Sequence, residues 1–211
     1  MPPSPLRVAI VAGVNPGKWT KAWAERRSEP IEVTPIDVAD QRTVLLSGQA
    51  DVAFVRLPID RAGLNVIRLY EELPVVVVPN EHPVSLFDEV TLADLEGETV
   101  RTEPHEDAID LVVAGAGILL LPQSIARQHA RRDLAVRPVA DAPFTEIAIA
   151  WLSDHGTDDE ASEKIEEFVG IVRGRTAASS RGAKVASAPQ KKAKAKPQSR
   201  VKPASRKPRR R

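Results

Sequence analysis

The fold of this chain is decided by Asp110-Leu111-Val112-Val113-Ala114-Gly115-Ala116-Gly117-Ile118-Leu119-Leu120-Leu121-Pro122-Gln123-Ser124. The first five residues close an apolar helix, and Gly115 can take the left-handed conformation that ends one. The apolar run from Ile118 to Leu121 is typical of a strand buried on both faces. Pro122 suits the first turn of a new helix. A helix, a glycine turn, a buried strand and a second helix in so short a span predict a wound α/β lobe.

Strands and helices are predicted to alternate along the rest of the chain. Strands are predicted at 6–11, 31–37, 51–56, 66–70, 74–78, 98–102, 118–121, 134–138 and 145–152. Helices are predicted at 16–27, 40–47, 91–95, 106–114, 124–131 and 158–172. The strand–helix–strand–helix–strand order at the start implies a parallel sheet with right-handed crossovers. Four consecutive valines in 74–78 predict a central, buried strand.

Charge divides the chain into an acidic body and a basic tail. From Arg173 to Arg211 there are 15 Lys and Arg and no Asp or Glu, whereas the preceding residues hold the other 15 basic and all 29 acidic residues, a formal net charge of −14. Residues 173–211 consist mainly of Ala, Lys, Pro, Ser and Arg, so they lack the apolar bulk for a core. We therefore expect a disordered tail there.

Several protein classes are disfavoured by composition. The chain has no cysteine, which leaves no disulfide framework and no thiolate nucleophile or metal site. No apolar run approaches the length of a membrane span, and the N-terminus does not have the pattern of a signal peptide. We expect a cytoplasmic protein that makes no contact with a membrane.

Four segments resemble, in the same order, segments of the effector-binding domain of LysR-type transcriptional regulators. The first runs from Leu45 to Arg56 and contains the Ser47-Gly48 turn and a buried strand. The others are Leu69 to Pro83, which ends in His-Pro, then Leu92 to Leu95, and finally Val112 to Pro122 with its paired glycines. Together they place the resemblance over residues 6–172.

The resemblance implies an α/β, two-lobed domain of the type II periplasmic-binding-protein kind with a ligand between the lobes. Lobe one would comprise 6–80 and 145–172, and lobe two 81–144. A helix and a strand that the family usually has before the helix at 106–114 have no counterpart here, so we expect a shortened second lobe. The family's winged helix-turn-helix has no counterpart before Leu6 either, so we expect a stand-alone effector-binding domain.

Candidate ligand contacts in lobe one lie where strands end. Gly13, Val14 and Asn15 precede a helix whose free N–H groups suit an anion, although an ordinary capped turn explains the same residues. The glycine spacing excludes a phosphate loop. Arg56 follows a buried strand and could bind a carboxylate bidentately, or could form a salt bridge to a loop acid.

Candidate contacts in lobe two are Thr102, as a hydroxyl donor, and the turn Gly115-Ala116-Gly117, which could equally be a packing turn. The four histidines have no metal-ligand spacing, and no catalytic triad can be assembled, so we expect no metal, no cofactor and no enzyme activity. Trp19 and Trp23, at helical spacing, favour a core or a dimer interface over ligand stacking.

The basic tail resembles the Lys/Ala/Pro tails of linker histones. Such a tail can neutralise phosphates without reading sequence, although it could instead stay solvated or fold back on the acidic body. The residues expected to contact DNA non-specifically are Lys191, Lys192, Lys194, Lys196, Arg206, Lys207, Arg209, Arg210 and Arg211.

The resulting hypothesis is a homodimeric effector-binding domain acting in transcription regulation, with a small carboxylate as its ligand. The alternative is a cytoplasmic small-molecule-binding or nucleoid-associated protein without a promoter-specific role.

Overall fold

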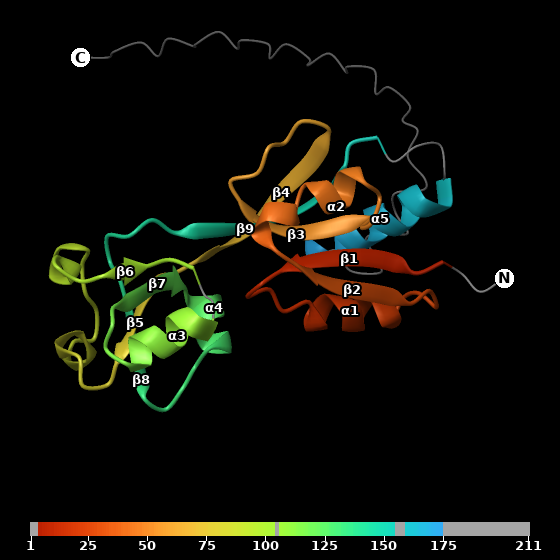
Figure 1. Cartoon of the computed structure of the whole chain (residues 1–211). Coiled ribbons are helices and arrows are strands. Elements are labelled where there is room, and N and C mark those ends of the chain that lie inside the picture. Colours follow the sequence, from red (N-terminus) through yellow and green to blue (C-terminus); the bar gives the residue numbers. More distant parts are fainter. Residues whose placement is uncertain (1–3, 104–105, 155–158, 175–211) are drawn as a thin grey trace, which may run out of the picture.

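The computed structural model describes residues 4–103, 106–154 and 159–174. Each of two lobes is built on one β-sheet (Figure 1). The strands are β1 (Leu6–Val11), β2 (Ile31–Ile36), β3 (Val52–Leu57), β4 (Leu64–Glu72), β5 (Pro74–Pro79), β6 (Val100–Arg101), β7 (Ile118–Pro122), β8 (Leu134–Pro138) and β9 (Thr145–Leu152). The helices are α1 (Gly17–Ala24), α2 (Thr43–Leu46), α3 (Glu106–Val113), α4 (Gln123–Gln128) and α5 (Asp159–Val172), with 3-10 turns η1 (Val38–Asp40), η2 (Pro83–Leu86) and η3 (Ala93–Leu95).

The sheet of lobe one has the strand order β2-β1-β3-β9-β4. β1 pairs in parallel with β2 and with β3, which confirms the parallel start predicted from the alternation of strands and helices. β9 then pairs antiparallel with both β3 and β4. The carboxyl ends of β1, β2 and β3 therefore lie along one edge, which is where open α/β sheets bind ligands.

The core of lobe one is aromatic and lies between the sheet and helices α1 and α5. Trp19 stacks on Phe54 with ring centroids 4.6 Å apart, and Trp23 meets Phe168 edge-on at 5.9 Å. The buried indole N–H of Trp23 donates to the carbonyl of Glu29 at 2.7 Å, which satisfies its hydrogen-bonding requirement. Both tryptophans thus belong to the core, one of the two structural roles that their spacing favoured.

The sheet of lobe two has the order β6-β7-β5-β8. The valines of β5 are fully or almost fully buried, as their continuous run predicted. Residues of α3 and α4 pack on one face of this sheet, and residues of η2 and η3 pack on the other. Apolar cover on both faces explains why the strand shows no alternation of apolar and polar residues.

The boundary between the lobes differs from the predicted one. Lobe one was predicted to extend to residue 80, but β5 pairs with β7 and β8 in the second sheet. The chain therefore crosses between Glu72 and Pro74, and it returns between β8 and β9. Glu72 and Thr145 are opposite each other in the β4–β9 ladder, so the two crossings lie side by side. Apolar periodicity identifies a strand but does not say which sheet it joins.

Three helix predictions also need correction. The helix expected at 91–95 is only the 3-10 turn η3. The helix expected at 40–47 is divided into the 3-10 turn η1 and the short helix α2. Pro122 is the last residue of β7 and the N-cap of α4, with an extended ψ of 140°, and not the first helical residue. Among the described residues, β6 is followed directly by α3 along the chain, in keeping with the predicted short second lobe. Within these same ranges no helix combines the length and apolarity that a membrane span needs.

Candidate functional site

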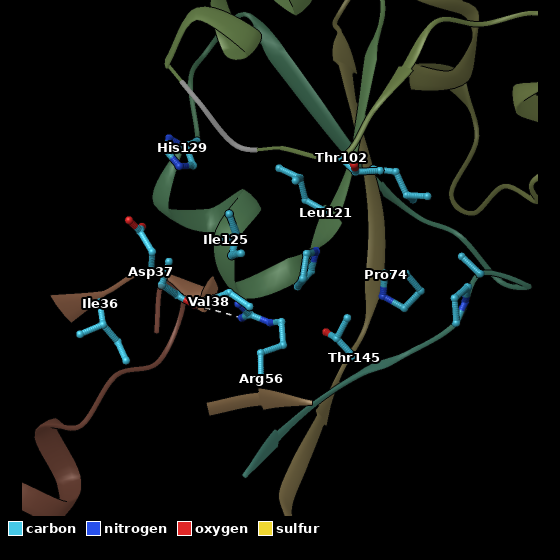
Figure 2. Close-up of a pocket in the computed structure, with 15 residues that line it drawn as sticks. Ile36, Asp37, Val38, Arg56, Pro74, Thr102, Leu121, Ile125, His129 and Thr145 are labelled. Carbon is cyan, nitrogen blue, oxygen red and sulfur yellow. Dashed lines mark hydrogen bonds between the residues drawn. The ribbon is translucent and has the colours of Figure 1, made fainter. Parts of the chain in front are cut away.

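A cavity of about 540 Å³ lies where the two lobes meet. Lobe one supplies the residues that follow β1, β2 and β3, and lobe two supplies the end of β7 and one side of α4 (Figure 2). Residues at the two crossings, among them Pro74 and Thr145, also line it. The lining residues are Ala12, Ile36, Asp37, Val38, Arg56, Pro74, Thr102, Leu120, Leu121, Pro122, Ile125, His129, Ala142, Pro143 and Thr145.

Most of this lining is apolar, and among its described residues three side chains can carry a charge. Asp37 lies just after β2 and is exposed, whereas His129 lies at the end of α4 and is half-buried. Arg56 is only 8% exposed. The cavity therefore combines apolar walls with one deeply placed guanidinium and an acidic group in a more open position.

The Arg56 guanidinium is already paired. Its Nε and Nη2 donate to Glu72 Oε2 at 3.0 and 2.8 Å, and Nη2 also donates to the carbonyl of Ala12 at 3.0 Å. Glu72 is 4% exposed and does not line the cavity, so it lies behind the guanidinium. Of the two alternatives that the sequence left open for Arg56, the structure shows the salt bridge to an acid.

The Glu72 carboxylate collects hydrogen bonds from both sides of the lobe junction. Thr145, at the start of β9, donates to Oε2 at 3.1 Å. Ser124, on α4 of lobe two, donates its hydroxyl to Oε1. A carboxylate that accepts bonds from a cation and two hydroxyls has most of its acceptor sites filled, which is the condition for burying it at tolerable cost.

The backbone of Arg56 is fixed by a second buried side chain. Gln41 accepts a hydrogen bond from the Arg56 N–H and donates one to the Arg56 carbonyl, both at 3.0 Å. Gln41 is 5% exposed. The position of the guanidinium is thus set by Gln41 from the backbone side and by Glu72 from the other end of the side chain.

Gly13 has a different function from the predicted ligand contact. It has a φ of +91°, and a Cβ on it would collide with the Ser124 hydroxyl. Glycine is required there because lobe one approaches α4 closely beside the Arg56–Glu72 pair. Gly13 and Val14 line a neighbouring open hollow instead of the main cavity. Asn15 accepts a hydrogen bond from the Gly17 N–H at 2.9 Å, which is the ordinary turn that the sequence allowed.

The turn Gly115-Ala116-Gly117 does not line the cavity. It lies at the amino end of β7, whereas the cavity meets the carboxyl end at Leu121 and Pro122. Tight packing accounts for Gly117, whose added Cβ would come 2.6 Å from the Thr99 carbonyl oxygen, whereas Gly115 has open space around it and a φ of +74°. Of the predicted ligand residues, Arg56 and Thr102 are the two that the structure brings to the cavity.

Other predicted sites can be placed only in part. The tail residues that were predicted to contact DNA lie outside the described residues, as do His105 and His155. His82 is held in lobe two, where Nε2 lies 3.0 Å from Glu98 Oε1 and Nδ1 accepts the Val84 N–H. No cluster of three metal-ligating side chains occurs in the described part of the chain.

The sequence reasoning missed four residues of this site: Asp37, Glu72, His129 and Thr145. A signal existed for Asp37, which directly follows a parallel strand at its carboxyl end. No sequence signal pointed to Glu72 or Thr145, because these two residues are brought together by the pairing of β4 with β9. His129 was seen only as one of several scattered histidines.

Tyr70 reports on the charges of the buried pair. Burial raises the pKa of its hydroxyl, the negative charge of Glu72 raises this pKa further, and the positive charge of Arg56 lowers it. Tyr70 is also the only tyrosine in the chain. Its ionisation is therefore a spectroscopic probe of the pair.

Two α/β lobes joined by two adjacent crossings, with a cavity between them, define the type II periplasmic-binding-protein class of domain. The sequence model of the LysR substrate binding domain matches residues 28–108. With the relatives and structures described next, this confirms the predicted resemblance to the effector-binding domain of LysR-type regulators.

Two relatives illustrate the likeness in sequence. The Hca operon transcriptional activator HcaR of Escherichia coli (strain K12) is 24% identical over 70% of this chain and 58% of its own length. A probable hydrogen peroxide-inducible genes activator of Mycobacterium avium is 28% identical over 66% of this chain and 55% of its own. The chain thus spans about half the length of the curated relatives that it matches.

Solved structures share the fold. The BenM effector binding domain with its effector benzoate has a TM-score of 0.63 at 21% identity, covering 82% of this chain and 95% of that one. The reduced form of the OxyR regulatory domain from Pseudomonas aeruginosa has a TM-score of 0.62 at 20% identity, covering 82% and 98%.

Removing the Glu72 carboxylate should destabilise the fold strongly. We expect Glu72→Ala to lower the free energy of unfolding by about 3–5 kcal/mol, because it leaves the buried Arg56 charge unpaired. Urea denaturation measures this change. The matched control is Glu71→Ala next to it, whose carboxylate forms an exposed pair with Arg68 and should cost less than about 1 kcal/mol. Equal losses in the two variants would refute the central role given to the Glu72 carboxylate.

The ionisation of Tyr70 should respond to the two charges in opposite directions. Glu72→Gln should lower the pKa of the Tyr70 hydroxyl, because it removes a nearby negative charge, and Arg56→Gln should raise it. The tyrosinate absorbance in a pH titration measures both changes. A shift in the same direction in both variants would contradict this arrangement of charges.

Proposed function

We propose that this domain is an effector sensor that acts in transcription regulation and binds a small molecule between its two lobes. The observation that carries the proposal is the largely apolar cavity of about 540 Å³ at the carboxyl ends of β1, β2 and β3. A domain of the same fold, that of BenM, has benzoate as its effector. The described residues offer no catalytic constellation, and the relatives are transcriptional regulators, which supports a role other than catalysis.

We infer that the domain acts by binding a ligand and not through the oxidation of a thiol. Some relatives are described as hydrogen peroxide-inducible genes activators, but this chain has no cysteine. Its own residues therefore offer an oxidant no thiol. A cavity with apolar walls and a few hydrogen-bonding groups is the usual form of a small-molecule site.

The basic tail adds a DNA contact to the proposal. Its Lys and Arg residues would neutralise phosphates and release counterions, which gives binding that is independent of sequence and sensitive to salt. We further propose a homodimer in the cytoplasm, as the resemblance implies. The alternative, a small-molecule-binding or nucleoid-associated protein with no promoter-specific role, is supported by the same tail, because sequence-independent contact is all that it provides.

Blocking the cavity should abolish stabilisation by ligands. In a thermal-shift screen of small acids, amides and alcohols, a ligand at about 100 times its Kd should raise Tm by about 5–10 °C. Thr102→Phe should remove this shift, because the added ring occupies the cavity. Thr34→Phe, on the exposed surface of β2 and outside the cavity, is the matched control and should retain it. A screen without any stabilising compound, or a shift that survives Thr102→Phe, would refute the proposed site.

Removing the tail should remove salt-dependent DNA binding. We expect the logarithm of the affinity of the full chain to fall linearly with the logarithm of salt concentration, with a slope of about −0.9 for each phosphate neutralised. A chain ending at Gly174, where the last turn of α5 is complete, should lose this binding. Fluorescence anisotropy with two unrelated duplexes measures both effects. A preference for one duplex that persists without the tail would contradict the proposal.

A further inference from the structure

We propose that the ligand of the cavity between the lobes is an uncharged, largely apolar molecule with one hydrogen-bond acceptor, and that the Arg56–Glu72 pair disfavours carboxylates. This inference rests on the proposed function, because it names the ligand class of that same cavity. It departs from the carboxylate predicted from the sequence, which required the charge of Arg56 to be available.

Among the described residues of the lining, no buried cationic side chain has an uncompensated charge that could pair with a ligand carboxylate. Arg56 is the one strongly basic side chain of the lining, and Glu72 compensates its charge at 2.8 Å. Asp37 adds a negative charge in a more open position. Among the described residues of the lining, His129 is the remaining titratable group, and as the C-cap of α4 it lies away from Arg56 (Figure 2). A ligand carboxylate beside Arg56 would thus be a second anion for a single cation.

Displacing Glu72 does not solve this difficulty for an acid. Glu72 is 4% exposed, and without Arg56 it would keep only the hydroxyls of Ser124 and Thr145 as partners. An ionised carboxylate that is buried without a countercharge is strongly unfavourable. The affinity gained by a ligand acid at Arg56 would therefore be offset by the charge left unpaired at Glu72.

An uncharged ligand with a hydrogen-bond acceptor would bind this cavity more favourably than a ligand carboxylate. The Nη1 group of Arg56 has no hydrogen-bond partner among the described residues, so it can donate to a carbonyl or hydroxyl oxygen without disturbing Glu72. Figure 2 shows Arg56 and Thr145 on one side of the cavity and Leu121 and Ile125 on the other. A ligand ring could pack on Leu121 and Ile125 while an oxygen attached to it accepts a hydrogen bond from Arg56. Such a ligand would use the apolar wall and the hydrogen-bond donor together.

Matched pairs of acids and primary amides test the ligand class. We would titrate the full chain by calorimetry with benzoate and benzamide, cyclohexanecarboxylate and its amide, and 2-naphthoate and its amide, at about pH 8.5, above the usual titration range of imidazole. In each pair that binds, we expect the amide to bind at least tenfold more tightly. Binding that persists in Thr102→Phe belongs to another surface and is subtracted.

Glu72→Gln should reverse the preference, because it frees the charge of Arg56 while keeping a side chain of the same shape. We expect the acids to gain at least tenfold in affinity, and the amides to change little. The double variant Arg56→Gln/Glu72→Gln is the matched control, because it removes both charges and should give the acids no gain. Should Glu72→Gln fail to fold, the comparison within the wild-type chain decides alone.

The possible outcomes separate this inference from the proposed function. Acids that bind the wild-type chain as tightly as their amides, and lose binding in Thr102→Phe, would overturn the ligand class while supporting the sensor. A complete lack of binding in both series counts against the proposed function, and the inference falls with it. Amide binding that is abolished by Thr102→Phe supports both.

Discussion

The buried ion pair between Arg56 and Glu72 is the interaction around which the junction of the two lobes is built. Arg56 is the penultimate residue of β3, the middle strand of the lobe-one sheet, and Glu72 ends the strand that leads to lobe two. Ser124 brings α4 of lobe two to the same carboxylate. A carboxylate and a guanidinium are costly to bury unless each is compensated. Opening this junction would therefore take the Ser124 hydroxyl away from the Glu72 carboxylate, while the ion pair with Arg56, which is formed within lobe one, would remain.

The same pair explains the chemical character of the cavity. Glu72 neutralises the charge of Arg56, whose guanidinium lines the cavity. Most of the other described lining residues are aliphatic or proline. The BenM domain, which shares this fold, has an effector that is an acid. Under the ligand class proposed above, the two domains would share a fold and differ in ligand, because the side chains that line the cavity decide what it binds.

Sequence alone predicted the strands well, because their apolar runs are continuous or regularly alternating. It also predicted the cores around Trp19 and around the valines of β5. It failed where a property depends on contacts between distant residues. The partner of Arg56 lies 16 residues away, and Gly13 is required by its approach to Ser124, more than a hundred residues later. For the turn Gly115-Ala116-Gly117 the sequence left a ligand contact and a packing turn both open, and a packing contact explains Gly117.

The side-by-side crossings restrict how the lobes can move. Glu72 and Thr145 form the last rung of the β4–β9 ladder before the chain enters lobe two, so the joint is a two-stranded ribbon. Such a ribbon bends across its flat face more readily than within its plane, because in-plane bending shears the interstrand hydrogen bonds. The joint therefore favours bending in one direction over bending in the others. We therefore expect relative motion of the lobes to be mainly a bending of this ribbon, with Glu72 at its last rung.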